Sequence, residues 1–236
     1  MNTNNTVRFS ETPESLELAR KNKIDIQVNA ILKRAQDANI PDRYMRINAQ
    51  RFLALLDDKY HSDKKKTTYH VYREANDLLK TPFVFIDGGN TDSRKEAGFA
   101  ILFRLIACDT FGGYYDCGSI NNKFRDMKYD RNSLASELKN KDILFIGELS
   151  LQQFEIRFHS GKFIDDVLTY RYDNLKPTII SFAESVESVV GILDEEKNIR
   201  AGTVLPELLF KAKNIKHENN PTKSILRIRV KRMLDE

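Results

Sequence analysis

The residues that could do chemistry are concentrated first in the polar segment 87–95, which reads Asp-Gly-Gly-Asn-Thr-Asp-Ser-Arg-Lys. The segment follows the apolar run 81–86, a predicted buried strand, and precedes apolar residues at helical spacing from Phe99 to Leu105. A turn between a strand and a helix binds phosphate when it has the pattern Gly-x-x-x-x-Gly-Lys-Ser/Thr, because its backbone N–H groups and its lysine face the anion. Segment 87–95 therefore stands where a nucleotide could bind, but with a different set of residues.

A second candidate residue, Glu148, ends the most apolar stretch of the chain. Residues 142–149 read Asp-Ile-Leu-Phe-Ile-Gly-Glu-Leu, and so short an apolar run predicts a strand that is buried on both faces of a parallel sheet. Apolar residues recur at helical spacing in 163–172, and 178–181 form another short strand after the breaker 174–177. Strand, helix and strand in this order predict a βαβ unit, so the residues alone support a parallel α/β domain.

Four segments, taken in chain order, resemble the AAA+ helicase loaders of the DnaC/DnaI/IstB type. They are the Ile-Pro-Asp-Arg-Tyr segment 40–44, the strand 142–149, the pair Arg171-Tyr172 and the Lys-Pro-Thr-Ile-Ile segment 176–180. The resemblance covers residues 38–210 and implies a three-layer α/β fold, the AAA+ (P-loop NTPase-like) core with a parallel sheet. The expected domains are a short N-terminal helical arm, residues 1–37, and a degenerate AAA+ domain, residues 38–236.

The resemblance assigns roles to the residues of segment 87–95. Gly88 corresponds to the first glycine of the phosphate-binding loop, Ser93 to the second glycine, Arg94 to the lysine and Lys95 to the hydroxyl residue that holds magnesium. An arginine can meet a phosphate, but a lysine cannot ligate magnesium. Only the first glycine keeps its type, so this loop is not expected to support ATP hydrolysis.

The other ATPase positions implied by the resemblance differ as well. Glu148 keeps the place of the catalytic glutamate, whereas Gly147 replaces the magnesium-supporting aspartate and Ala183 stands at the sensor 1 position, which is usually polar. Near the expected arginine finger, the closest residue is Glu207. Phosphoryl transfer depends on a positioned metal and positioned cations. We therefore expect no metal site, no ATPase activity and no ATP or magnesium cofactor, unless the altered loop still binds the nucleotide.

The N-terminal helix is the candidate for binding a partner. Thr12-Pro13-Glu14 is a helix start, with a capping hydroxyl, a proline at the first helical position and an acid near the positive end of the helix dipole. One face of this helix is apolar, which predicts either a contribution to the core or a docking surface. The resemblance favours docking, because it implies an N-terminal helical segment that grips the hexameric helicase. The candidate docking residues are Leu16, Ile24, Val28, Ile31 and Leu32.

The C-terminal segment is the most basic part of the chain. Apolar and basic residues alternate in 226–231, which predicts a strand with one basic face. Such a strand is either an edge strand whose charges prevent pairing with other chains or a track for the phosphates of single-stranded DNA. The candidate DNA-binding residues are Arg227, Arg229, Lys231 and Arg232.

Composition excludes several other classes of protein. The chain has 236 residues, enough for one main domain with a proper core, and its formal net charge of +4 is too small to indicate nucleic-acid binding by itself. No apolar run reaches the length of a membrane span and the N-terminus has no signal-peptide pattern, so we expect a cytoplasmic protein. Cys108 and Cys117 are the only cysteines and are expected to be buried, reduced thiols.

The remaining periodic segments predict shorter elements. Helices are expected at 49–56, 69–79, 120–127 and 134–138, an exposed loop at 61–66 and a strand at 114–117. This order of elements is the one that the resemblance implies, and the sequence contains no internal repeat.

These observations lead to one principal functional hypothesis. The protein is expected to be a DNA replication protein that binds and loads a DnaB-type replicative helicase without hydrolysing ATP, with single-stranded DNA as a further partner. One alternative is an active ATPase loader, in which Arg94 or Lys95 replaces the loop lysine and Glu148 stays the base. Another is a decoy that occupies the host loader's site on the helicase and inhibits it, and a weaker one is an IstB-like role in transposition. A helicase loader that has diverged so far is expected to come from a phage or another mobile element.

Overall fold

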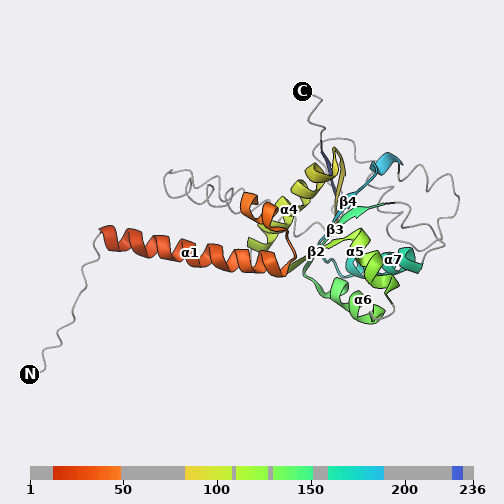
Figure 1. The fold of residues 1–236 in the computed structure, drawn as a ribbon, viewed down its shortest axis with the longest axis horizontal. Helices are drawn as coiled ribbons and strands as arrows, with labels where there is room; N and C mark the ends of the chain where they lie inside the picture. The colour runs from red at the N-terminus through yellow and green to blue at the C-terminus, as the bar shows by residue number, and fades with distance from the viewer. Residues whose placement is uncertain are drawn as a thin grey trace, which may run out of the picture.

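The computed structural model describes residues 13–48, 83–107, 110–126, 130–150, 159–188 and 225–230. Five parallel strands form one sheet in the order β2-β3-β4-β1-β5 (Figure 1). The strands are β1 Phe83–Gly88, β2 Gly112–Asp116, β3 Ile143–Leu149, β4 Thr178–Phe182 and β5 Ile225–Val230. The helices are α1 Pro13–Asp37, α4 Thr91–Ala107, α5 Cys117–Arg125, α6 Arg131–Asn140 and α7 His159–Asp173.

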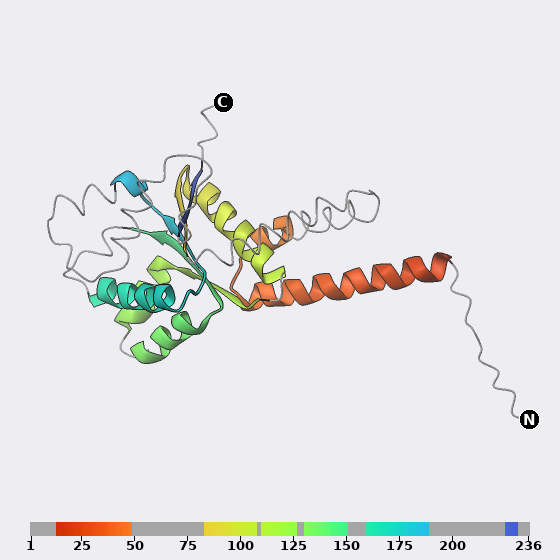
Figure 2. The ribbon, with the colours of Figure 1, turned by 180° about the vertical axis from the view of Figure 1, so that it is seen from behind.

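Helices cover both faces of the sheet, so the fold has three layers (Figure 1; Figure 2). The end of α1 and α4 pack on one face, whereas α5, α6 and α7 cover the other. Strand residues alternate between the faces: in β1, Phe83 and Phe85 pack with α7, while Val84 and Ile86 pack with α4. The strands are apolar on both sides because both faces are covered. The expected three-layer α/β fold with a parallel sheet is confirmed.

Most predicted elements within the described residues are present, with shifted ends. The predicted helices 120–127 and 134–138 are α5 and α6, which begin earlier because the side chains of Asp116 and Asp130 cap their first turns. Cys117 is buried, as expected. Among the described residues, no helix is long and apolar enough to span a membrane. Some predictions lie outside the described residues: the helices 49–56 and 69–79, the loop 61–66, Cys108, Glu207, Lys231 and Arg232.

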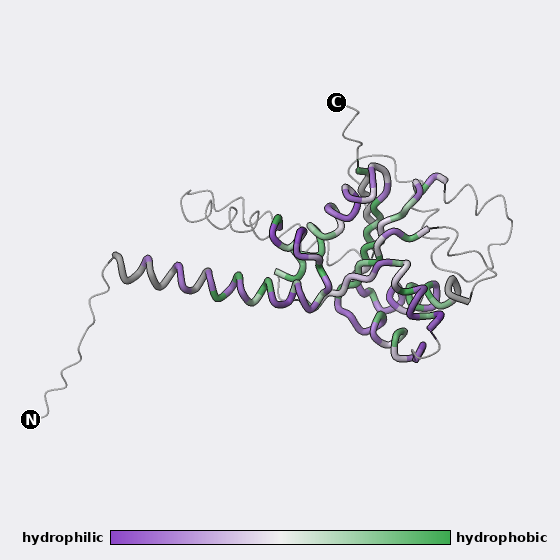
Figure 3. The backbone as a smooth tube through the Cα atoms, viewed as in Figure 1, coloured by the Kyte–Doolittle hydropathy of each residue, from purple (hydrophilic) through white to green (hydrophobic). Residues whose placement is uncertain are grey.

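The helix α1 leaves the α/β body as a single helix, and only its last turns join the core (Figure 1). Ile31 is 5% exposed and Ala35 is fully buried, whereas Ile26 is 70% exposed. Figure 3 shows that the described part of α1 is mostly hydrophilic, in contrast to the green strands of the sheet. Stability of α1 near the body therefore comes from packing, while its outer turns depend on helix formation alone.

The base of α1 is fixed by a defined helix end. Asn39 has a φ of 60°, in the left-handed region, and the N–H of Ile40 donates to the carbonyl of Ala35 at 3.1 Å, the geometry of a Schellman motif. Beside it, the N–H of Tyr114 donates to the carbonyl of Ala38 at 2.7 Å. Because β2 is an edge strand, this bond covers part of its unpaired side.

The segment 40–44 then contacts the α/β domain. The Tyr44 ring lies 4.5 Å from the ring of Phe99 on α4, and the Tyr44 hydroxyl donates to Asp92 at 3.5 Å. Burial and the neighbouring Asp92 carboxylate raise the pKa of Tyr44. Arg43 forms a longer ion pair with Asp92 at 3.8 Å, and it is exposed, so it contributes little. The aromatic contact is what attaches this segment to α4.

Arg171, one of the residues that carry the resemblance, is a structural clamp at the amino ends of β3 and β4. Its side chain is fully buried, and its Nη1 atom donates to the carbonyls of Leu138, Lys139 and Lys141 at 3.0, 3.3 and 2.8 Å. The Nε and Nη2 atoms donate to the Thr178 hydroxyl, the Asp142 carbonyl and the Pro177 carbonyl. The end of α6 and the starts of β3 and β4 therefore meet on one guanidinium group.

Candidate functional site

The candidate site lies at the carboxyl ends of β1, β3 and β4, where ligands bind in open parallel sheets. The connection after β1 is much shorter than the loop 87–95 expected from the sequence. β1 continues to Gly88 and α4 begins at Thr91, so only Gly89 and Asn90 connect them. Ser93, Arg94 and Lys95 consequently lie in the first turns of α4 and not in a loop, and the expectation of a long loop is wrong.

Asn90 explains why α4 starts so early. Its side-chain Oδ1 accepts a hydrogen bond from the N–H of Ser93 at 2.8 Å, which is the bond of a helix N-cap. In a phosphate-binding loop, N–H groups at this helix end point at the anion. Here one of them is already satisfied by a neutral side chain of the chain itself.

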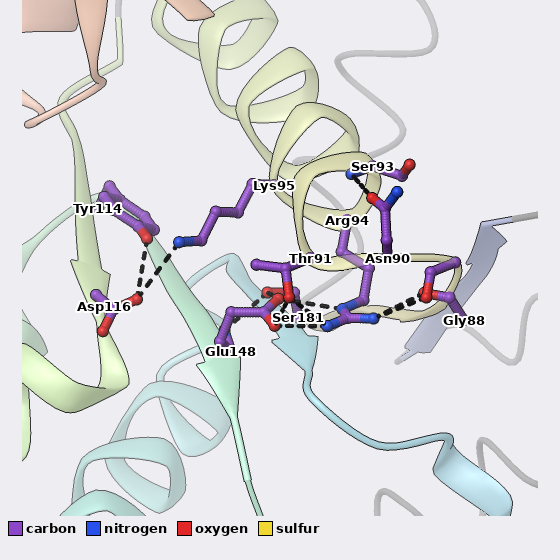
Figure 4. A network of polar contacts seen from close by, with 11 residues as sticks. Gly88, Asn90, Thr91, Ser93, Arg94, Lys95, Tyr114, Asp116, Glu148 and Ser181 are labelled. Carbon is purple, nitrogen blue, oxygen red and sulfur yellow. Dashed lines mark hydrogen bonds and ion pairs between the residues drawn. The ribbon is translucent and has the colours of Figure 1, made fainter. Parts of the chain in front are cut away.

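Arg94 occupies the space between this turn and the end of β3 (Figure 4). Its Nη1 donates to the carbonyls of Gly88 and Gly89 at 3.0 and 3.1 Å. Its Nε and Nη2 donate to the two carboxylate oxygens of Glu148 at 3.1 and 2.6 Å, and Nη2 also donates to the Thr91 hydroxyl at 3.1 Å. The side chains of the pair are 7% and 15% exposed. The positions of the loop lysine and the catalytic glutamate are therefore bonded to each other.

Glu148 is held from the other side by β4. Its N–H donates to the Ser181 hydroxyl at 2.9 Å, and that hydroxyl donates to the Glu148 Oε1 at 3.1 Å. Thr91 donates to the Oε2 at 3.2 Å. Glu148 has a φ of 56°, in the left-handed region that non-glycine residues rarely adopt, and the pairing of β3 with β4 shifts register beside it. Both carboxylate oxygens thus accept hydrogen bonds from side chains of the same chain.

Ser181 is the site residue that the sequence interpretation missed. The residue proposed for the sensor 1 position, Ala183, is exposed, and its N–H donates to the carbonyl of Leu149 at 3.0 Å. Ser181 is fully buried and lies two residues earlier, within β4. The available signal was a hydroxyl near the carboxyl end of β4, next to the apolar residues 179, 180 and 182.

Lys95 and Gly147 lie next to Tyr114, at the side of the site nearest β2. The Lys95 Nζ lies 3.8 Å from Asp116 Oδ2, to which the Tyr114 hydroxyl donates at 3.4 Å. Burial, and then the Asp116 carboxylate, raises the pKa of Tyr114. A Cβ atom at Gly147 would lie 2.7 Å from the Tyr114 ring and 2.8 Å from its oxygen. The place of a magnesium-supporting aspartate is therefore filled by this tyrosine.

Taken together, these residues do not fit a magnesium nucleotide. Arg94 fills the turn, Asn90 satisfies a helix N–H, Lys95 offers an ammonium where an oxygen ligand is needed, and Tyr114 leaves no room for an aspartate at Gly147. In the part of the chain that the structure describes, no group of three His, Cys, Asp or Glu side chains could hold a metal ion. The absence of a nucleotide cofactor stays a prediction, which a binding experiment can test.

The proposed docking and DNA residues are placed as follows. Ile31 is buried in the cluster that joins α1 to α4, so it belongs to the core, and Leu32 is partly buried against the same cluster. Val28 is half-buried, and for Leu16 and Ile24 only the helical backbone is described. Arg227 and Arg229 are paired through their Cα atoms with Phe85 and Asp87; they lie on β5, the predicted strand, which is an edge strand among the described residues. Their contact with DNA stays a prediction.

Comparison with known proteins gives similarity at the level of the fold. No protein-family model matches the chain, and no curated protein sequence matches it. The solved structure of DnaI aligns with a TM-score of 0.43 and 12% identity over 55% of this chain and 70% of that one. The DnaC helicase loader aligns with a TM-score of 0.40 and 18% identity over 80% and 99%. AMPPCP-bound DnaA from Aquifex aeolicus aligns with a TM-score of 0.41 and 13% identity over 54% and 41%.

All three TM-scores are below 0.5, so the assignment of the fold rests on features of this chain. The parallel sheet has the order β2-β3-β4-β1-β5, and both faces are covered by helices. The turn after β1 faces Glu148 at the end of β3, which is the arrangement of a nucleotide site. By its strand order and its two covered faces, the chain has a three-layer α/β fold with a parallel sheet.

Proposed function

We propose that this protein binds a DnaB-type replicative helicase and assists its loading on DNA, without hydrolysing ATP itself. The observation that most supports the absence of hydrolysis is the 2.6 Å ion pair between Arg94 and Glu148. A hydrolytic site needs a cation on the phosphates and a carboxylate on the attacking water. Here the two groups neutralise each other, and the fold serves as a scaffold for binding partners.

The proposed contact with the helicase is the outer part of α1. Where their side chains are described, the residues from Lys21 to Gln27 are exposed, and they include the large apolar side chain of Ile26. This part of α1 is separated from the buried turns that begin at Ile31. A deletion of residues 1–36 is therefore a poor test, because it would remove Ile31 and Ala35 from the core. Substitutions at exposed positions leave the fold intact and isolate the contact.

The first expected result concerns nucleotide binding. The melting temperature of the protein should not rise with millimolar Mg-ATP, Mg-ADP or a non-hydrolysable analogue, because a ligand that binds the native state must stabilise it once its concentration exceeds the dissociation constant. Differential scanning fluorimetry measures this, with an ATP-dependent helicase loader as the positive control. A saturable rise would support the alternative of an active ATPase, especially if turnover were lost in Glu148→Gln.

The second expected result concerns the helicase. Ile26→Glu should weaken binding to the hexameric helicase by about tenfold or more, because it places a charge in an apolar contact. The matched control is Gln27→Glu, which adds the same charge at the next exposed position of α1. Both variants should keep the melting temperature of the wild type. Size-exclusion co-elution and fluorescence anisotropy measure the affinity, and equal affinities of the two variants would contradict the assignment of Ile26.

Loading and inhibition require the same contact, so a separate assay decides between them. The helicase is added to DNA coated with single-strand-binding protein, and unwinding is measured with and without this protein. A loader increases unwinding. A decoy that blocks the host loader decreases it, and that outcome would replace the proposed function by the inhibitor.

A further inference from the structure

We propose that Arg94 is a built-in replacement for the nucleotide: its guanidinium group joins the turn after β1 to β3 and β4 and holds α4, with the base of α1, in one arrangement. This inference deepens the proposed function and rests on it only where the helicase is concerned. The ion pair itself can be tested without any partner.

The first line of evidence is that the guanidinium group is completely coordinated. All of its N–H directions have an acceptor: Nε and Nη2 share the Glu148 carboxylate, Nη1 binds the carbonyls of Gly88 and Gly89, and Nη2 also binds Thr91. The two parallel bonds to Glu148 are the bidentate form that is strongest between arginine and a carboxylate. A surface arginine that happened to lie over the site would have some N–H donors bonded to water instead of protein acceptors.

The second line of evidence is the set of elements that these acceptors join. Gly88 is the last residue of β1, Thr91 the first residue of α4, and Glu148 stands near the end of β3. Ser181 extends the same network to β4 through its bonds with Glu148. A nucleotide bound at this edge of the sheet would touch the same elements. Arg94 thus makes from inside the chain the connections that a ligand would make from outside.

The third line of evidence connects Arg94 to α1. Asp92, two residues before Arg94 on α4, accepts a hydrogen bond from Tyr44. The Tyr44 ring packs on Phe99, about two turns beyond Asp92 on α4, and Phe99 packs on Phe145 of β3 at 5.3 Å. Tyr44, which follows the end of α1, is therefore attached to the helix that Arg94 holds. No part of this path requires a nucleotide.

The consequence is a protein that is not switched by ATP. A ligand changes a conformational equilibrium only when it binds one state better than the other. An arginine that is covalently part of the chain has a fixed effective concentration at the site, so ATP has to displace it in order to bind. Any release of the helicase would then depend on other factors, such as DNA.

The test is chemical rescue: a substitution of Arg94 leaves a cavity, and a small guanidinium ion is added to fill it. Arg94→Ala should lower the melting temperature by about 5–10 °C. Millimolar ethylguanidinium, which has the atoms that this substitution removes, should restore part of the loss, whereas ethylammonium should not, because it lacks the planar fork. The matched control is Lys95→Ala, since Lys95 has a 3.8 Å contact with Asp116 and takes no part in the network. This control should respond to neither ion.

Two further variants keep the test decisive. Rescue should disappear in the double variant Arg94→Ala/Glu148→Gln, which lacks the carboxylate. If Arg94→Ala is insoluble, Arg94→Lys and Glu148→Gln are combined instead, and their effects on the melting temperature should be clearly non-additive. A wild-type melting temperature for Arg94→Ala, equal rescue by ethylammonium, or additive effects would overturn the inference.

The outcomes for the two proposals can be separated. A wild-type protein that fails to bind the helicase removes the proposed function and leaves the guanidinium rescue as evidence for the internal ligand. A protein that binds the helicase but whose Arg94→Ala variant unfolds like the wild type removes this inference alone. Helicase affinity of the wild type should also be the same with and without Mg-ATP, and a change of tenfold would overturn the claim that ATP does not switch it.

Discussion

Replacement of Arg171 by alanine should lower the free energy of unfolding by about 4 kcal/mol, the largest stability effect that we expect. The guanidinium group is fully buried and donates to the ends of α6, β3 and β4, including the carbonyls of Lys141 and Pro177 at 2.8 and 2.7 Å. Burial lowers the pKa of Arg171 to about 10, so the group is still a cation at neutral pH and all its N–H donors are present. Alanine leaves those buried carbonyls without a partner and adds a cavity.

The measurement is chemical unfolding monitored by circular dichroism. Arg171→Lys should recover little of the stability, because an ammonium group has no planar fork to span several carbonyls. The matched control is Arg125→Ala, at an exposed arginine in the last turn of α5, which should change the free energy of unfolding by less than about 0.5 kcal/mol. If Arg171→Ala unfolded at the same denaturant concentration as this control, the clamp would have no energetic role.

The second large effect is expected when the aspartate of a working ATPase is put back. Gly147→Asp should lower the free energy of unfolding by about 3 kcal/mol or more and should not produce nucleotide binding. A side chain at this buried position meets the Tyr114 ring at 2.7 Å. That ring cannot easily move, because it packs on Phe99 at 4.6 Å and on Phe145 at 5.0 Å. Calorimetric unfolding measures the loss of stability, and titration with Mg-ATP tests for nucleotide binding.

A double-mutant cycle tests the cause of this effect. Gly147→Ala introduces only the Cβ atom, so its cost should fall by about 1 kcal/mol or more when Tyr114 is first replaced by leucine. An equal cost in both backgrounds would show that the backbone and not the tyrosine ring forbids a side chain at Gly147. Nucleotide binding by Gly147→Asp would contradict the view that the site is filled.

The sequence was sufficient for the elements because their signals are local. The apolar run 142–149 became β3, the periodic run 163–172 became α7, and 178–181 became β4, each within a few residues. The period of the apolar residues shows which face of each element is buried, and that period differs between strands and helices. The helix-start residues Thr12-Pro13-Glu14 predicted the beginning of α1, which starts at Pro13.

The site could not be predicted in the same way, because its contacts are not local. Arg94 and Glu148 are 54 positions apart, and Ser181 is 33 positions from Glu148. Matching Arg94 to a loop lysine predicts a cation that is free to bind phosphate. In the fold, Arg94 instead binds the carboxylate of Glu148. The length of the turn was also misjudged, because the capping bond of Asn90 decides where α4 begins.

The motif that carried the resemblance turns out to report on architecture. Arg171 and Thr178 bond to each other at 2.8 Å, and Arg171 also binds the carbonyl of Pro177. Their spacing is what a clamp between a helix end and two strand starts needs. These residues stabilise the fold and give no evidence of ATP binding. The motif can therefore be present in a chain whose residues at the nucleotide-binding positions differ from those of a working ATPase.

The way α1 is fastened has a mechanical consequence. A helix of 25 residues is about 37 Å long, so a tilt of about 10° at its base displaces its tip by about 6 Å. The base is held by the Schellman motif at Asn39, the bond from Tyr114 to Ala38 and the ring of Tyr44. Small changes in these three contacts are amplified along the rod. The spatial precision of whatever the tip holds is therefore set by side chains that lie far from it.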